Sequence, residues 1–154
     1  MPAVLIVCSA NICRSPMAEA ILKKLISDRP DAEQWHVESA GTWAENGRPP
    51  AYLSRYVMEQ MGMDISNHQS QPVSLRLLMN FDLILTMEME HKTWLKTQYK
   101  EFSDRIYLLS EMVGDEADIP DPIGSELFEF QATALLLVRI LTDGLDQICE
   151  LACD

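Results

Sequence analysis

Along this chain, short apolar runs alternate with segments in which apolar residues recur at the spacing of a helix. Four runs have the length and composition of buried strands, at 3–7, 36–40, 81–86 and 105–109. Between the first two, apolar residues recur at the spacing of an amphipathic helix, which we expect to end before Pro30. These residues are Ala18, Ile21, Leu22 and Leu25. The alternation predicts an α/β fold, a three-layer α/β/α sandwich with a central four-stranded parallel sheet.

The same spacing predicts three further helices. One contains Leu53, Val57 and Met61, and another follows Thr86. The last is expected to run without a break from about Ser125 to near the C-terminus. No repeat or linker interrupts the pattern, so we expect residues 1–154 to form a single domain.

The loop after the first predicted strand carries a thiol at its start and a guanidinium at its end. These are Cys8 and Arg14, and Ser15 followed by Pro16 has the pattern of a helix N-cap and first turn. Backbone amides and the positive end of the helix dipole would stabilise both a thiolate and a bound dianion. The guanidinium fork would bind two phosphate oxygens. The pattern therefore predicts a phosphate-binding loop with its own nucleophile, and it lacks the glycine spacing of an ATP-binding Walker motif.

Side chains from other loops should meet this one. Ligands of a parallel sheet bind beyond the carboxyl ends of its strands, where residues 39–43 and the loop containing Asp121 also belong. Cleavage of a phosphate monoester needs an acid for the leaving oxygen, and Asp121, held between two prolines, is our candidate. The alternative is an aspartate favoured there by turn chemistry alone.

Composition narrows the classes of partner. The chain has 12 Lys and Arg against 24 Asp and Glu, a net charge of -12, which speaks against nucleic acid as a partner. No segment has the pattern of a signal peptide or the roughly 20 apolar residues of a membrane span, so we expect a cytoplasmic protein with no membrane partner.

The cysteines and histidines do not have the spacing of metal ligands. We therefore expect no metal and no cofactor, and four free thiols rather than a disulfide framework. Cys13 either forms a reversible disulfide with Cys8 or packs beneath the loop as a buried thiol, and both alternatives stay open. His36 and His91 receive no role.

The chain resembles the low-molecular-weight protein tyrosine phosphatases. Their signature of strand, Cys-x4-Cys-Arg-Ser-Pro and helix is matched by Cys8, Cys13, Arg14, Ser15 and Pro16. Later segments look like further family motifs in the right order, so that the resemblance covers nearly the whole chain. These segments are 39–43, 47–50, 81–85 and 121–122.

The resemblance implies hydrolysis of protein phosphotyrosine through a cysteinyl-phosphate intermediate. Cys8 would be the nucleophile, Arg14 would bind phosphate, and Asp121 would act as general acid and then as general base. The expected partners are a phosphorylated protein, phosphate and similar oxyanions, and the expected state is a monomer or a weak dimer. The residues expected to bind substrate or phosphate are Ser9, Ala10, Asn11, Ile12, Cys13, Ser15, Trp43 and Ile123.

A supporting network is also implied. The resemblance implies that Ser39 and His68 complete a hydrogen-bond network with Asn11 and Ser15. Asn11 should adopt left-handed backbone, and the Ser15 hydroxyl should donate to the Cys8 thiolate.

The choice of substrate is where the chain departs from the family. Two aromatic residues commonly follow the Asp-Pro pair in the tyrosine-specific members, whereas Ile123 and Gly124 stand here. Ile12 nevertheless matches the tyrosine phosphatases better than the threonine of related bacterial protein arginine phosphatases. Phosphotyrosine is the favoured substrate, and protein phosphoarginine is the alternative.

Two other functions are disfavoured. Arsenate reductases of the same fold need resolving cysteines in a mid-chain segment, and this chain has none between Cys13 and Cys149. A phosphate-binding module without turnover would not need both Cys8 and Asp121.

Overall fold

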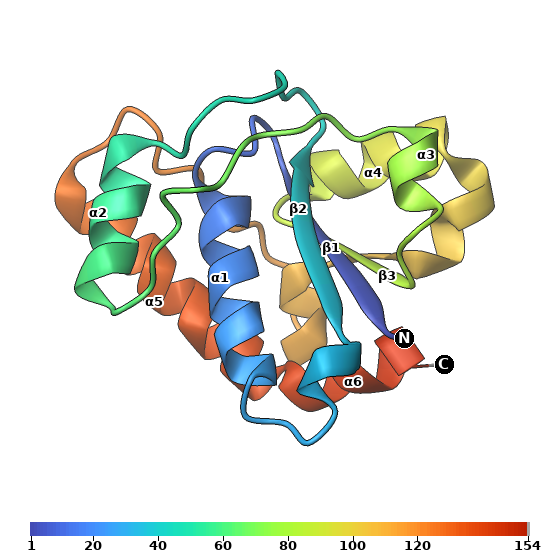
Figure 1. The fold of residues 1–154 in the computed structure, drawn as a ribbon. Helices are drawn as coiled ribbons and strands as arrows, with labels where there is room; N and C mark the ends of the chain where they lie inside the picture. The colour runs from blue at the N-terminus through green and yellow to red at the C-terminus, as the bar shows by residue number, and fades with distance from the viewer. Residues whose placement is uncertain (154) are drawn as a thin grey trace.

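The core of the molecule is a four-stranded parallel sheet, in the order β2-β1-β3-β4 (Figure 1). The computed structural model describes residues 1–153. All four predicted strands and the α/β fold are confirmed, although the third strand begins two residues later than expected. The strands are β1 (Ala3–Cys8), β2 (His36–Gly41), β3 (Leu83–Thr86) and β4 (Ile106–Leu108).

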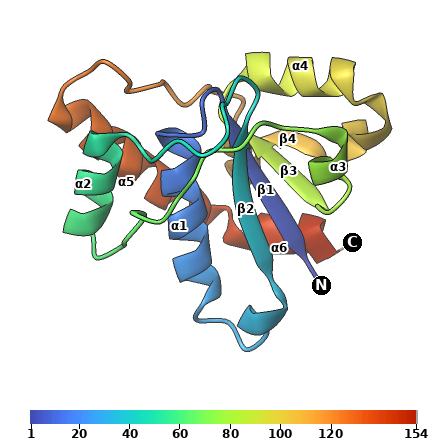
Figure 2. The same cartoon turned by 45° about the horizontal axis from the view of Figure 1, so that its top comes forward.

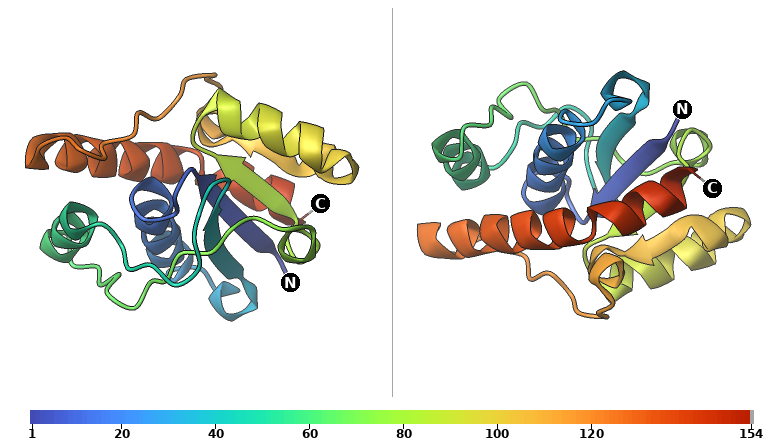
Figure 3. Two further views of the ribbon diagram at one scale, coloured as in Figure 1. Left: turned by 90° about the horizontal axis from the view of Figure 1, so that it is seen from above. Right: turned by 90° about the horizontal axis from the view of Figure 1, so that it is seen from below.

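Helices cover both faces of the sheet (Figure 3). On one face lie α1 (Arg14–Ile26), α2 (Tyr52–Gln60), α5 (Leu127–Asp143) and α6 (Leu145–Cys153). On the other lie α3 (Leu75–Leu78), α4 (Met89–Gln98) and the 3-10 turn Lys100–Arg105. Two further 3-10 turns span Ala32–Gln34 and Leu109–Val113. Within the described residues, no helix combines the length and apolarity needed to cross a membrane.

The central strand β1 explains why its sequence is a continuous apolar run. All six of its residues are buried. Val4, Ile6 and Cys8 belong to the core under α1 and α5, while Leu5 and Val7 belong to the core under α3 and α4. A strand covered on both faces cannot alternate apolar with polar residues.

The C-terminal helix is not continuous, and this part of the sequence prediction was wrong. It is divided at Gly144 into α5 and α6. A Cβ added at Gly144 would lie 2.7 Å from the Cβ of Met112 and 2.8 Å from the carbonyl oxygen of Ile140. The break lets the chain pass close to the turn that contains Met112, and an apolar pattern read along one chain does not reveal that approach.

The loops that follow the strands gather at one edge of the sheet. Figure 2 brings this edge forward and shows the β1–α1 loop beside the segment after β2 and the segment that leads to α5. Thr42 N donates to the carbonyl oxygen of Cys8, and Ile119 N donates to that of Met87, each at 2.9 Å. Residues distant in the sequence thus converge where the parallel topology places them.

Candidate functional site

The loop between β1 and α1 turns its carbonyl groups outward. The carbonyl oxygens of Cys8, Ser9 and Ile12 accept from the amides of Thr42, Trp43 and Ala51, at 2.9, 2.8 and 2.8 Å. No backbone amide from residues 9–13 donates to an acceptor within the described residues. Amides with this arrangement at a helix N-terminus form a concave site for an anion.

Asn11 holds the loop in this shape. Its φ of 59° places it in the left-handed region, as expected, and its side chain is fully buried. The Oδ1 atom accepts from Gln71 N at 3.0 Å, so Nδ2 faces the other way and donates to Ser15 Oγ at 2.8 Å and to Ser39 Oγ at 2.9 Å. The backbone oxygen of Asn11 lies 2.7 Å from His68 Nε2. The four members of the expected network are therefore in contact.

The network sets the direction of the hydrogen bond at the thiol. Ser15 Oγ lies 2.9 Å from Cys8 Sγ and already accepts from Asn11. Its own hydrogen is therefore free to donate to a thiolate sulfur. At the far end of the network, Ser39 Oγ donates to Glu19 Oε1 at 2.6 Å. The Ser15 hydroxyl is therefore positioned to donate to Cys8 Sγ.

Ser15 is not the N-cap that the sequence suggested. Helix α1 begins at Arg14 with Cys13 at the cap, and Ser15 is fully buried inside the first turn. A serine before proline at a helix start ordinarily uses its hydroxyl to cap the helix. Here the hydroxyl contacts Cys8 and Asn11 instead, so the correction strengthens its connection to the thiol.

Arg14 is held rigidly although it is one of the largest buried side chains. It is 1% exposed, and its Nη1 donates to Glu88 Oε2 at 2.5 Å and to the carbonyl oxygen of Ile119 at 2.7 Å. Its Nε is buried and has no partner among the described residues. A phosphate oxygen bound in the loop would give this donor a partner, as expected for a guanidinium that binds phosphate.

Asp121 reaches the same place from the loop before α5. Its Oδ2 lies 3.4 Å from Arg14 Nη2, and its Oδ1 accepts from Ile123 N at 3.1 Å. Its side chain is 35% exposed. A carboxyl group that contacts both the guanidinium and solvent can exchange protons with water and with a leaving group at the phosphate site.

The strand β2 approaches the loop closely at Gly41. A Cβ there would lie 2.3 Å from the carbonyl oxygen of Ser9 and 3.0 Å from Asn11 N. The chain then continues into Trp43, whose side chain is 86% exposed. Ile123 is 51% exposed and Ile12 is half-buried. These three side chains are thus at least partly exposed, and their part in binding a substrate stays a prediction, as does that of Ala10.

Cys13 is buried below the loop. All four cysteines of the chain are free thiols. Burial raises the pKa of Cys13 to about 12. At neutral pH this thiol is protonated, and attack on an oxidised Cys8 would need its thiolate.

Two functional contacts were missed in the sequence. Glu88, the partner of Arg14, is two residues beyond the end of β3, so the same edge rule could have found it. His91 was given no role, yet its Nε2 lies 2.8 Å from Ser9 Oγ. Its Nδ1 accepts from Glu88 N at 3.1 Å. The neutral ring must therefore carry its proton on Nε2 and donate to Ser9, which leaves the Ser9 hydroxyl hydrogen free for a bound ligand.

The position of His91 predicts a pH effect on stability. Burial, together with the charge of Arg14, lowers the pKa of His91 from its ordinary value. The unfolded chain therefore binds this proton at a higher pH than the folded chain, and stability falls as the pH drops below about 6.5. His91→Gln keeps one donor and one acceptor but does not titrate. We expect the wild type to lose more free energy of unfolding than this variant between about pH 7 and pH 5, measured by urea denaturation. Equal losses of free energy of unfolding in the wild type and in His91→Gln would contradict this effect of His91.

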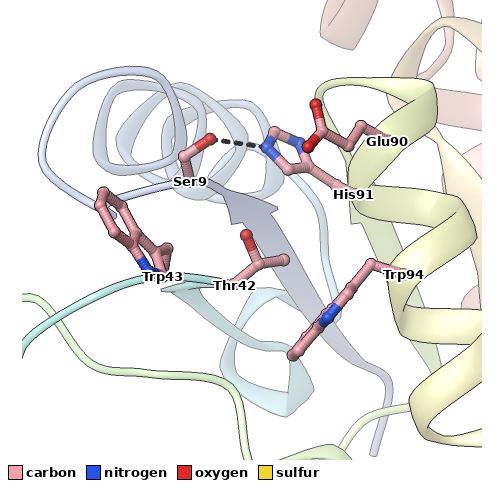
Figure 4. A pocket seen from close by; sticks show the side chains of 6 residues that line it. All are labelled: Ser9, Thr42, Trp43, Glu90, His91 and Trp94. Atoms are coloured by element: carbon pink, nitrogen blue, oxygen red, sulfur yellow. Dashed lines mark hydrogen bonds between the residues drawn. The ribbon is translucent and has the colours of Figure 1, made fainter.

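A pocket of about 400 Å³ opens beside the loop (Figure 4). Trp43 and Trp94 lie on either side of it, and Ser9 and His91, joined by their hydrogen bond, form part of its lining. The remaining lining residues are Thr42 and Glu90.

A buried guanidinium, a thiol and a cradle of amides meet at the end of a parallel strand, which is the combination that the sequence predicts for a phosphate-binding loop with its own nucleophile. The family model for low molecular weight phosphotyrosine protein phosphatases matches residues 3–149. The chain therefore belongs to this family, whose members are cysteine-type hydrolases.

Individual relatives agree with the family. A protein-arginine-phosphatase of Bacillus subtilis (strain 168) is 33% identical over 140 residues, which are 90% of this chain and 91% of the relative. The crystal structure of a low molecular weight protein tyrosine phosphatase from T. tengcongensis has a TM-score of 0.88 at 35% identity, covering 96% of this chain and 99% of that one. A YwlE arginine phosphatase with a Cys-to-Ser mutation and a phosphorylated active site serine has a TM-score of 0.86 at 28% identity, covering 96% and 95%.

Proposed function

We propose that this protein hydrolyses phosphate monoesters of proteins in two steps through a phosphorylated Cys8. The observation that carries the proposal is the convergence of three groups. The sulfur of Cys8 lies 2.9 Å from Ser15 Oγ, the guanidinium of Arg14 is fixed by Glu88, and Asp121 contacts that guanidinium from the opposite loop. The phosphorylated active site serine of the mutant arginine phosphatase supports a nucleophile at this position.

In the first step Cys8 Sγ forms a bond to phosphorus while the bond to the ester oxygen breaks. Asp121 gives its proton to that oxygen, which leaves as an alcohol or phenol. The charge on the transferred group is bound by Arg14 and the loop amides.

In the second step a water oxygen attacks the phosphorus and the sulfur–phosphorus bond breaks. The electron pair returns to Cys8 as thiolate, and the carboxylate of Asp121 takes the proton of the water. Phosphate leaves, and both residues return to their starting protonation.

The variant Asp121→Ala tests whether Asp121 protonates the leaving oxygen. We expect kcat/KM for phenyl phosphate, which reports the first step, to fall by about 10²- to 10⁴-fold, because phenolate is a poor leaving group without a proton. The decrease should be much smaller for nitrophenyl phosphate, whose leaving group is a weaker base. Asp115→Ala, an exposed aspartate earlier in the same segment, is the control. Equal losses on both esters would show that Asp121 does not protonate the leaving oxygen.

We propose phosphotyrosine as the physiological phosphoryl donor. Support comes from Ile12 and the exposed ring of Trp43, which offer apolar walls to a phenyl ring. The aliphatic Ile123 replaces the aromatic residues of the tyrosine-specific members, and the arginine phosphatase relative makes phosphoarginine the second candidate.

Paired peptides distinguish the two substrates. We expect a higher kcat/KM on a phosphotyrosine peptide than on the same peptide with phosphoarginine. Ile12→Thr, which introduces the threonine typical of the arginine phosphatases, should move that ratio toward phosphoarginine. A wild-type preference for phosphoarginine would overturn the choice of substrate and leave the two-step chemistry intact.

We also propose that residues 1–154 form one phosphatase domain that acts as a monomer or a weak dimer in the cytoplasm. Helices α1 and α5 share one core, which supports a single folding unit. The four free thiols suit a reducing compartment. A single cooperative unfolding transition, sedimentation at micromolar concentration and cell fractionation test these three points.

A further inference from the structure

The pocket between Trp43 and Trp94 shares Trp43 with the proposed wall for the substrate ring, but its residues on α4, Glu90 and Trp94, have no part in the two-step chemistry above. Its lining runs from Ser9, the first residue after the nucleophile, to side chains of α4, and Asp121 is not among the lining residues. A peptide whose phosphorylated side chain enters the loop between β1 and α1 would lie across the rim of this pocket. Extended peptide advances about 3.3 to 3.6 Å per residue, so a side chain near the phosphorylated residue would meet this pocket.

The two tryptophans present exposed ring surface to the pocket. Trp43 is 86% exposed and Trp94 is 38% exposed. Among the described residues, Trp43 has no aromatic partner, and Trp94 has one edge contact with Tyr99. The guanidinium groups that lie over aromatic rings are placed elsewhere, on Trp35 and Phe102. Both indole faces are therefore available to a ligand.

Glu90 gives the pocket its charge. Its exposed carboxylate makes no hydrogen bond or ion pair within the described residues. The neighbouring Lys92 is engaged by Glu111 at 2.9 Å and does not neutralise it. His91 is neutral, as its hydrogen bonds require. An apolar ligand would desolvate Glu90 without compensation, whereas a cation would pair with it and stack on the indoles.

We infer that this pocket binds a Lys or Arg side chain of the phosphorylated protein, close to the phosphorylated residue. The inference rests on the proposed function and adds a specificity determinant to it. The net charge of -12 acts in the same direction, because it disfavours an anionic peptide and attracts one whose flanking residues are basic.

The test compares two phosphotyrosine peptides that differ by one side chain, lysine or norleucine, placed at successive positions on each side of the phosphotyrosine. At the best position we expect the lysine peptide to have a kcat/KM about three- to tenfold higher, the size of one cation–π contact with one exposed ion pair. Added salt should reduce the preference.

Glu90→Gln and Trp94→Ala should each remove most of the preference for lysine. Both variants should hydrolyse an aryl phosphate at the wild-type rate, because among the described residues neither side chain has a hydrogen bond or ion pair with Cys8, Arg14 or Asp121. Glu150→Gln removes the same charge from α6, at the opposite end of the molecule, and should keep the preference.

Three results would overturn the inference: equal rates on the two peptides, a preference for norleucine, or a lysine preference that survives in Glu90→Gln. A failure of the proposed function would look different, since the wild type would then fail to hydrolyse the aryl phosphate as well.

Discussion

Cys8→Ser is expected to lower the turnover of an aryl phosphate by at least about 10⁴-fold, because a serine hydroxyl at neutral pH is a far weaker nucleophile than a thiolate. The replacement is nearly isosteric and keeps the contact with Ser15, so the loop should still bind phosphate. The measurement is steady-state hydrolysis without added metal, together with the dissociation constant for inorganic phosphate.

Cys149→Ser provides the matched control, since it removes a thiol from α6, away from the site. Its rate should equal that of the wild type. If the wild type and Cys8→Ser were equally inactive while both bound phosphate, the protein would be a phosphate-binding module and the catalytic account would fail.

Arg14→Lys should lower kcat/KM for the same ester by about 10³- to 10⁵-fold, the range seen when an arginine that stabilises a transferring phosphoryl group is lost. Lysine keeps the positive charge but not the planar fork. It cannot contact Glu88, the Ile119 carbonyl and two phosphate oxygens at once, as the geometry of Arg14 allows. Both kcat and the affinity for phosphate should fall.

The control for this variant is Arg139→Lys, an exposed change of the same type on α5. Thermal unfolding of Arg14→Lys must be checked, because Arg14 and Glu88 form a partly buried ion pair. A folded Arg14→Lys protein with wild-type kinetics would show that charge alone suffices at this position.

The features predicted from the sequence were those that depend on local pattern. The strands follow from apolar runs, and the place of Cys8 follows from the strand before it. Asp121 could be brought to the same edge because parallel strands present their carboxyl ends together. The left-handed Asn11 follows from the side chain that best tolerates that backbone.

The features that were missed depend on contacts between distant segments. Gly144 breaks the last helix because the chain meets Met112 there, and no helical period encodes that approach. Ser15 has the sequence of an N-cap, but its hydroxyl contacts Cys8 and Asn11. The sequence around His91 is that of an ordinary histidine near the start of a helix. Only the structure shows that its Nε2 lies 2.8 Å from Ser9 Oγ.

The central claim is that a phosphoryl group passes through Cys8, and the most direct measurement traps it there. Asp121→Ala lacks the group that activates water in the second step, so it should accumulate the intermediate. When a reaction with nitrophenyl phosphate, whose leaving group needs no acid, is quenched rapidly, peptide mass spectrometry should find one phosphoryl group on Cys8, in an amount that matches the first burst of released nitrophenol. Released nitrophenol without phosphoryl on Cys8, or phosphoryl on another side chain, would contradict the account.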